Sequence, residues 1–179
     1  MKKLQILLLV CFMMVGHLAT AQIVQGQLLI GGTAGFNTTF VEDQDNPFTI
    51  QILPSIYKLI TPNIAIGGEF GIQYDKVGDR NTTSVAVLPG ARYYFTDGAS
   101  GPAFFVSLGV GVATARSEFN GTSDSATAFA YTVGPGVAFF VSKNISIDAI
   151  LAYQRIGGDV DTSGIGLNIG VQAYLGGGE

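Results

Sequence analysis

A strand motif that occurs four times constrains the fold of this chain more than any other feature. The stretch Val85–Thr96 reads VAVLPGARYYFT, and as an extended strand it places its side chains alternately on two faces. Similar stretches begin at Pro54 and Pro135, and a weaker copy without proline begins at Gly170. In the three copies with proline, a Thr or Ser follows seven residues later and a turn comes at once. This repetition predicts an all-β chain built from hairpins.

The first 21 residues have the form of a secretory signal peptide. Lys2 and Lys3 make a basic start, Ile6–Val15 is apolar but too short for a reliable membrane span, and Ala19–Ala21 is a small-residue cleavage site. We therefore expect residues 1–21 to be removed, which leaves a domain over residues 22–179. The alternative is a single N-terminal membrane helix, which the cleavage site disfavours.

Removing the leader also limits the chemistry of the chain. The only cysteine, Cys11, and the only histidine, His17, lie within the leader. The remaining chain has no thiol nucleophile and no imidazole base, so we predict that it is not an enzyme and has no catalytic residues. Without Lys2 and Lys3, seven basic residues face thirteen acidic ones, which argues against a nucleic-acid partner.

No cofactor or metal site is expected either. The acidic stretch Glu42–Asp45 and the pair Asp159 and Asp161 are the best candidates for calcium, but neither has the spacing of an ordered calcium loop. Solvated loops explain them better. The many Gly-x-Gly pairs have the period of a strand and are interpreted as packing positions rather than phosphate loops.

Alternation of apolar and small or polar residues predicts eight strands. Their connections alternate between long polar segments and tight turns, so the long segments should share one end of the molecule, and the tight turns and both termini the other. The expected long loops are residues 37–47, 75–81, 117–125 and 157–163. The expected strands are Gln25–Phe36, Phe48–Ile60, Ile64–Tyr74, Val85–Thr96, Ala103–Ala115, Ala126–Val141, Ile145–Ile156 and Gly164–Leu175.

The two faces of these strands indicate which side meets lipid. One face carries nearly all the large apolar residues, and the other carries mostly Gly, Ala, Ser and Thr with a few charges. An eight-stranded barrel has an interior only just wide enough for side chains, so small and polar residues suit it, while rows of Phe and Val suit lipid. We therefore predict an eight-stranded antiparallel up-and-down transmembrane β-barrel. Expected interfacial aromatic residues are Tyr74, Tyr93, Phe95, Tyr131, Phe139, Phe140 and Tyr153, although alternation puts Phe140 on the inner face.

The three aligned prolines complicate this prediction. Proline cannot donate to the ladder and avoids central strands. Pro54, Pro89 and Pro135 stand at one level of the predicted barrel, so we expect a bulge or a locally open strand pair there.

With its leader, its strand alternation and its Pro-Gly strands, the chain resembles the small outer-membrane β-barrel proteins of the OmpA/OmpX-like group, and most of all the PorT-like barrel-domain proteins. The resemblance extends over Gln22–Leu175. It implies the outer membrane of a Gram-negative bacterium, with outer-membrane lipid and the insertion machinery as partners. Barrels of this group usually end in an aromatic residue, whereas here Tyr174-Leu175 is followed by Gly-Gly-Gly-Glu, so the terminal insertion signal is imperfect.

Three charged residues form the candidate site. Glu69, Arg92 and Asp148 all point inward in the same half of the predicted barrel. Because an unpaired charge there is costly, we expect Arg92 to pair with Glu69 across the hairpin and with Asp148. A structural ion pair that fills the lumen is favoured over a gate or a proton path.

The preferred function is that of a monomeric, non-enzymatic outer-membrane barrel whose long loops contact an unknown surface partner. A narrow pore is the second hypothesis, but Arg92 and the bulky side chains predicted beside it would block a water path. A soluble, lipocalin-like periplasmic barrel is the third, and it requires the large apolar residues to lie inside.

Overall fold

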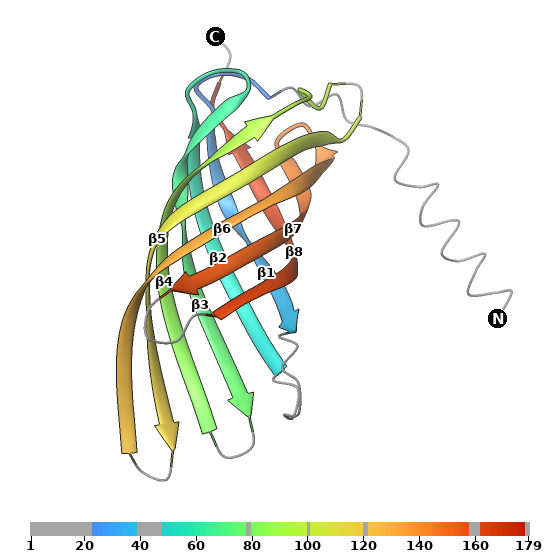
Figure 1. Cartoon of the computed structure of the whole chain (residues 1–179). Helices are drawn as coiled ribbons and strands as arrows, with labels where there is room; N and C mark the ends of the chain where they lie inside the picture. The colour runs from blue at the N-terminus through green and yellow to red at the C-terminus, as the bar shows by residue number, and fades with distance from the viewer. Residues whose placement is uncertain are drawn as a thin grey trace, which may run out of the picture.

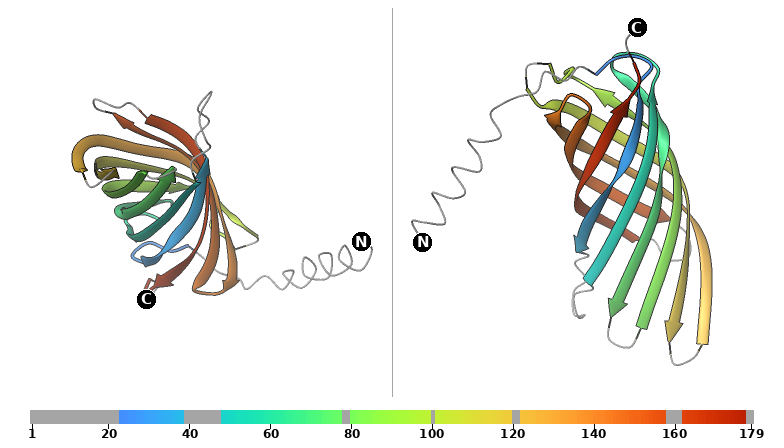
Figure 2. Two further views of the ribbon diagram at one scale, coloured as in Figure 1. Left: turned by 90° about the horizontal axis from the view of Figure 1, so that it is seen from below. Right: turned by 180° about the vertical axis from the view of Figure 1, so that it is seen from behind.

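The computed structural model is a closed antiparallel barrel in which every strand pairs with its neighbours in sequence and β1 pairs with β8 (Figures 1 and 2). The prediction of eight antiparallel strands in an up-and-down barrel is therefore confirmed. The strands are β1 (Leu28–Thr38), β2 (Phe48–Leu59), β3 (Ile64–Val77), β4 (Arg80–Tyr94), β5 (Ala103–Phe119), β6 (Thr122–Ser142), β7 (Ile145–Gly157) and β8 (Thr162–Leu175).

The structure describes residues 23–38, 48–77, 80–99, 101–119, 122–157 and 162–177. The expected leader, residues 1–21, and most of the expected loop 37–47 lie outside these ranges. No helix in this part of the chain is long and apolar enough to cross a membrane.

Two of the expected long loops are mostly strand. β3 and β4 stay paired as far as Val77 and Arg80, and β5 and β6 as far as Phe119 and Thr122, so the predictions of loops over 75–81 and 117–125 were wrong. Both segments are mostly polar and show no apolar alternation, yet backbone pairing with the neighbouring strand holds them extended. Figure 1 shows the β5–β6 hairpin reaching well beyond the ends of β1 and β2.

The large apolar side chains lie on the outside of the barrel. Ile52 is 55% exposed and Phe104 is 52% exposed, while their strand neighbours Leu53 and Phe105 are buried in the lumen. This arrangement is the one a membrane barrel needs and the reverse of a soluble ligand-binding barrel. The other outward positions that are large, apolar and exposed include Ile56, Phe70, Val87, Leu108, Val112, Phe129, Leu151, Leu167 and Ile169.

The expected interfacial aromatic residues lie on both faces of the barrel wall, some exposed on the outside and one buried inside. Tyr93 and Phe95 are exposed beside a tight turn and make an edge-to-face contact with ring centroids 5.2 Å apart. Phe140 is buried inside the barrel, as alternation requires, so its assignment to the interfacial ring was wrong. Its ring packs on that of Tyr174 at a centroid distance of 5.1 Å.

Each of the three prolines sits beside a local opening in the ladder. β2 and β3 pair at Ile52–Ile72 and again at Ser55–Glu69, with no pairing around Pro54 in between. The same interruption occurs between β4 and β5 beside Pro89, and between β6 and β7 beside Pro135. The register is unchanged across each gap, so the feature is an open pair rather than a bulge, because proline lacks the N–H that would close it.

Close approach of neighbouring strands explains two inward-facing glycines. A Cβ on Gly67 would lie 2.0 Å from the backbone oxygen of Ile56, and a Cβ on Gly170 would lie 2.0 Å from that of Gly32. No other residue fits these positions without moving a neighbouring strand. The glycines thus set how tightly the barrel wall can curve.

Candidate functional site in the lumen

Arg92 lies at the centre of a charged cluster inside the barrel. It is on β4, shortly after the Pro89-Gly90 step, and its side chain is 1% exposed. Its Nη1 donates to Oδ2 of Asp148 at 3.1 Å and its Nη2 to Oε1 of Glu69 at 3.4 Å. The structure thus brings together all three residues singled out in the sequence, from β3, β4 and β7.

The surrounding side chains hold these charges in place. The guanidinium carbon of Arg92 lies 4.6 Å from the ring centroid of Tyr57 and 5.1 Å from that of Phe105, within the range of cation–π contacts. The Tyr57 hydroxyl donates to Oε1 of Glu69 at 3.0 Å. The Ser146 hydroxyl donates to Oδ1 of Asp148 at 2.5 Å. Charge-assisted bonds of this kind offset the cost of taking the three charges out of water.

Sequence reasoning did not give Ser146 a role. Alternation placed it on the inner face two residues before Asp148, and residues at i and i+2 of a strand share a face, so this spacing was the available signal. Arg92 Nε is the one atom of the guanidinium without a hydrogen-bond partner among the described residues.

Buried aromatic residues close the lumen on the tight-turn side of the cluster. The hydroxyls of Tyr94 and Tyr174 are 3.4 Å apart, and the ring of Tyr94 packs on Phe105 at a centroid distance of 5.2 Å. Together with Phe140 and the charged cluster, these residues form a continuous buried plug, which we name the lumen plug. Its members are Tyr57, Glu69, Arg92, Tyr94, Phe105, Phe140, Asp148 and Tyr174.

The segment that precedes β1 completes this closure, which the sequence did not predict. Ile23 is 4% exposed and belongs to the same buried apolar cluster as the plug aromatics. Its N–H donates to the Asp97 carbonyl at 3.0 Å, and the Gly26 N–H donates to the Leu59 carbonyl at 2.8 Å. Gly26 has a φ of 91°, a left-handed conformation that glycine adopts without strain. The chain therefore crosses the tight-turn end of the barrel from β1 to the β4–β5 turn.

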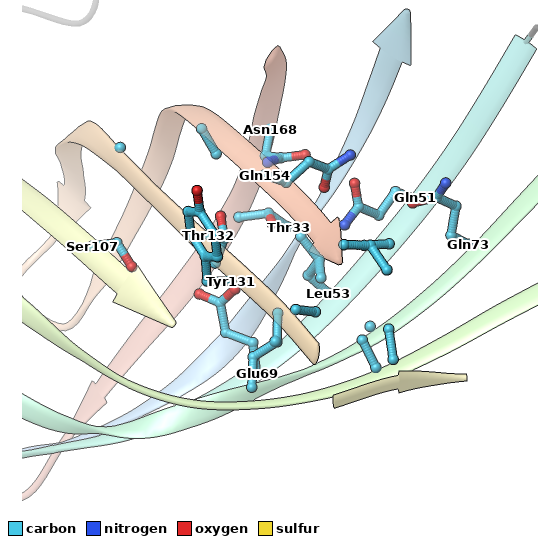
Figure 3. Close-up of a pocket in the computed structure, with 18 of the residues that line it drawn as sticks. Thr33, Gln51, Leu53, Glu69, Gln73, Ser107, Tyr131, Thr132, Gln154 and Asn168 are labelled. Carbon is cyan, nitrogen blue, oxygen red and sulfur yellow. The ribbon is translucent and has the colours of Figure 1, made fainter. Parts of the chain in front are cut away.

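On the other side of the plug the lumen widens into a cavity of about 60 Å³ (Figure 3). Glu69 lines it, next to the plug, and its walls continue to Gln73, Ser84 and Ile156, near the strand ends at the long-hairpin side. Inward-facing small residues such as Gly71 make the space. The described side chains therefore close this cavity at the tight-turn end.

Among the described residues, no group of three or more His, Cys, Asp and Glu side chains could hold a metal ion. The buried charges join strands β3, β4 and β7, and the lumen plug obstructs passage through the lumen.

The model of the outer membrane protein beta-barrel domain family matches residues 6–172, most of the chain. This protein belongs to that family. Among solved structures, the barrel is similar to Neisserial surface protein A, NspA (17% identity, 85% of this chain and 99% of NspA, TM-score 0.66), and to Ail, the attachment invasion locus protein of Yersinia pestis (16% identity, 84% and 99%, TM-score 0.59).

A third similar structure is OprG of Pseudomonas aeruginosa (10% identity, 88% of this chain and 99% of OprG, TM-score 0.51). At these identities the likeness establishes the fold of this outer-membrane barrel and nothing finer. No curated protein matched the chain.

Proposed function

We propose that this outer-membrane barrel is non-enzymatic and does not conduct, and that it serves the cell envelope as a wall element with protruding hairpins for surface contact. The observation that carries the proposal is the lumen plug. Arg92 is held by two carboxylates and two aromatic rings across the lumen, and it cannot leave without exposing buried charges.

The contact surface would be formed by the hairpins on the long-connection side. β5 and β6 pair in full up to Phe119 and Thr122, while β7 joins β6 only from Gly157 opposite Phe129. Among the described residues, the outer part of β6, with Asp124 exposed, therefore has no neighbouring strand on its β7 side, while β5 stays paired with β4 as far as Glu118. NspA is named as a surface protein and Ail as an attachment protein. Those names support a surface role for a barrel of this shape, and the hairpins supply the argument from this chain.

Further parts of the proposal rest on sequence and family. The protein would be exported by its leader, inserted by the outer-membrane insertion machinery into a Gram-negative outer membrane, and remain a monomer in lipid. Its negative charge argues against nucleic acid as the surface partner. Heat-modifiability tests the membrane barrel: the refolded protein should migrate differently on an SDS gel before and after boiling, and refolding should require detergent.

Single-channel recording in planar bilayers separates the proposal from the pore hypothesis. We expect no stepwise conductance from the refolded wild-type protein. Regular, unitary conductance steps from the wild-type protein would contradict the proposal and favour the narrow pore.

A further inference from the structure

The cavity beyond the lumen plug has two unlike walls. One wall is apolar and centres on the buried cluster of Leu88, Ala113 and Ala130. The other carries four side-chain carboxamides from four strands, β2, β3, β7 and β8. Figure 3 shows them grouped on one side of the cavity: Gln51, Gln73, Gln154 and Asn168.

The oxygen of one of these carboxamides is buried without a hydrogen-bond partner among the described residues. Asn168 is 5% exposed, and its Oδ1 accepts no hydrogen bond from any described residue. This oxygen lies against Gly35 of the neighbouring strand, where a Cβ would come within 1.9 Å of it. An unpaired carboxamide oxygen costs free energy, and turning this side chain toward a solute in the cavity that it lines would pair the oxygen and relieve that cost.

The charges around the cavity favour a neutral occupant. Glu69 and Arg155 are the charged residues in its lining, one of each sign. Glu69 Oε1 already accepts from Tyr57 and from Arg92. A bound anion would share the cavity with the Glu69 carboxylate and a bound cation with the Arg155 guanidinium, so the lining favours neither sign of charge.

The polar groups that remain are amides and hydroxyls, which both donate and accept. Besides the carboxamides, the hydroxyls of Thr33, Ser84, Ser107 and Thr132 belong to residues of the lining. Groups of this kind pair with the hydroxyls of a polyol, while the apolar wall suits its C–H face. The cavity, at about 60 Å³, has room for a small solute of the size of glycerol.

We propose that the cavity of this barrel is a binding site for a small uncharged polyhydroxylated solute, which hydrogen-bonds to Asn168 and the neighbouring carboxamides and packs against the Leu88–Ala113–Ala130 wall. The site is reached from the long-hairpin end, since the lumen plug closes the other end. It is independent of the surface contacts proposed for the hairpins.

The test is a titration of the ¹⁵N-labelled protein, refolded in detergent micelles, with glycerol and with ribose. The side-chain amide signals of Asn168 and Gln154 should shift and saturate with at least one of the two probes, with an apparent Kd in the millimolar range. Acetate and methylammonium, matched in size but charged, should not produce a saturating shift. Saturation by a charged probe alone would overturn the assignment to neutral solutes.

Variants locate the effect in the cavity. Ala113→Phe fills the space and should abolish the saturating shift, whereas Val112→Phe, its outward-facing neighbour, should leave the shift unchanged. If Ala113→Phe does not refold, Ala130→Leu is the milder filling, and its affinity should fall at least about fivefold. Shifts that grow linearly without saturation, or that persist in a refolded filled variant, would overturn the proposal.

Discussion

Replacing Arg92 by methionine tests whether the charged cluster holds the barrel together. Methionine keeps much of the apolar stem that packs between the rings of Tyr57 and Phe105 and removes only the charged head. Asp148, which is 1% exposed, then loses its partner at 3.1 Å and cannot be hydrated, whereas Glu69 keeps the Tyr57 hydroxyl and faces the cavity. Removing one partner of a buried pair costs about 3–5 kcal/mol.

We expect the free energy of unfolding of Arg92→Met to fall by about 3 kcal/mol, most of it from the stranded Asp148 carboxylate. The assay is urea-dependent unfolding in detergent micelles or lipid vesicles, followed by the gel-mobility shift. The double variant Arg92→Met/Asp148→Asn removes the stranded charge and should recover about half of the loss. Asp148→Asn alone leaves Arg92 paired with Glu69 and should cost about 1 kcal/mol.

A double-mutant cycle over these variants gives the coupling directly. If Arg92 and Asp148 stabilise each other, the double variant should lose at least about 1 kcal/mol less unfolding free energy than the two single variants lose together. An unchanged unfolding midpoint for Arg92→Met, or strictly additive effects in the cycle, would refute the view that the ion pair stabilises the barrel.

Three further changes probe the wall and its ends. Leu108→Arg puts a charge on the lipid face and should lower the free energy of unfolding in vesicles by about 2–4 kcal/mol. Ser125→Arg, on the β5–β6 hairpin, is the control and should leave the free energy of unfolding almost unchanged. Equal losses for the two variants would contradict the placement of the apolar face toward lipid. Gly67→Ala should lower the free energy of unfolding by more than about 2 kcal/mol or prevent the gel-mobility shift, because its Cβ would meet a neighbouring backbone oxygen. Gly164→Ala is the control and should fold normally, since no atom lies within 4 Å of the new Cβ. Ile23→Asp buries a carboxylate in the apolar cluster at the tight-turn end and should lower the unfolding midpoint in urea by the equivalent of about 2–4 kcal/mol; an unchanged midpoint would mean that this segment does not seal the barrel.

The fold could be predicted because the strands of a membrane barrel alternate large apolar residues, which face lipid, with small or polar residues, which face the lumen. Ile52 and Leu53, or Phe104 and Phe105, differ in environment only through the two-residue period of a strand, so their faces follow from position alone. The period also placed Glu69, Arg92 and Asp148 in one half of the lumen, since strand lengths and tight turns fix the height of each residue.

Prediction failed where alternation carries no information. Asp75–Asn81 and Ser117–Ser125 are mostly polar at alternate positions of both kinds, so strand and loop look alike in the sequence, and only the pairing of backbone groups distinguishes them. For the prolines, the sequence left a bulge and an open pair as alternatives, and the unchanged register of the neighbouring strands decided for the open pair.

The sequence by itself determined the number of strands, their faces and the residues that share the lumen, because these depend on local periodicity. The tertiary structure decided what those residues touch. The Arg92 guanidinium contacts the rings of Tyr57 and Phe105, Ile23 closes one end, and Asn168 Oδ1 has no hydrogen-bond partner among the described residues. These features depend on contacts between distant strands. Such contacts depend on the curvature and the stagger of the closed sheet, and neither can be read from the sequence of a single strand.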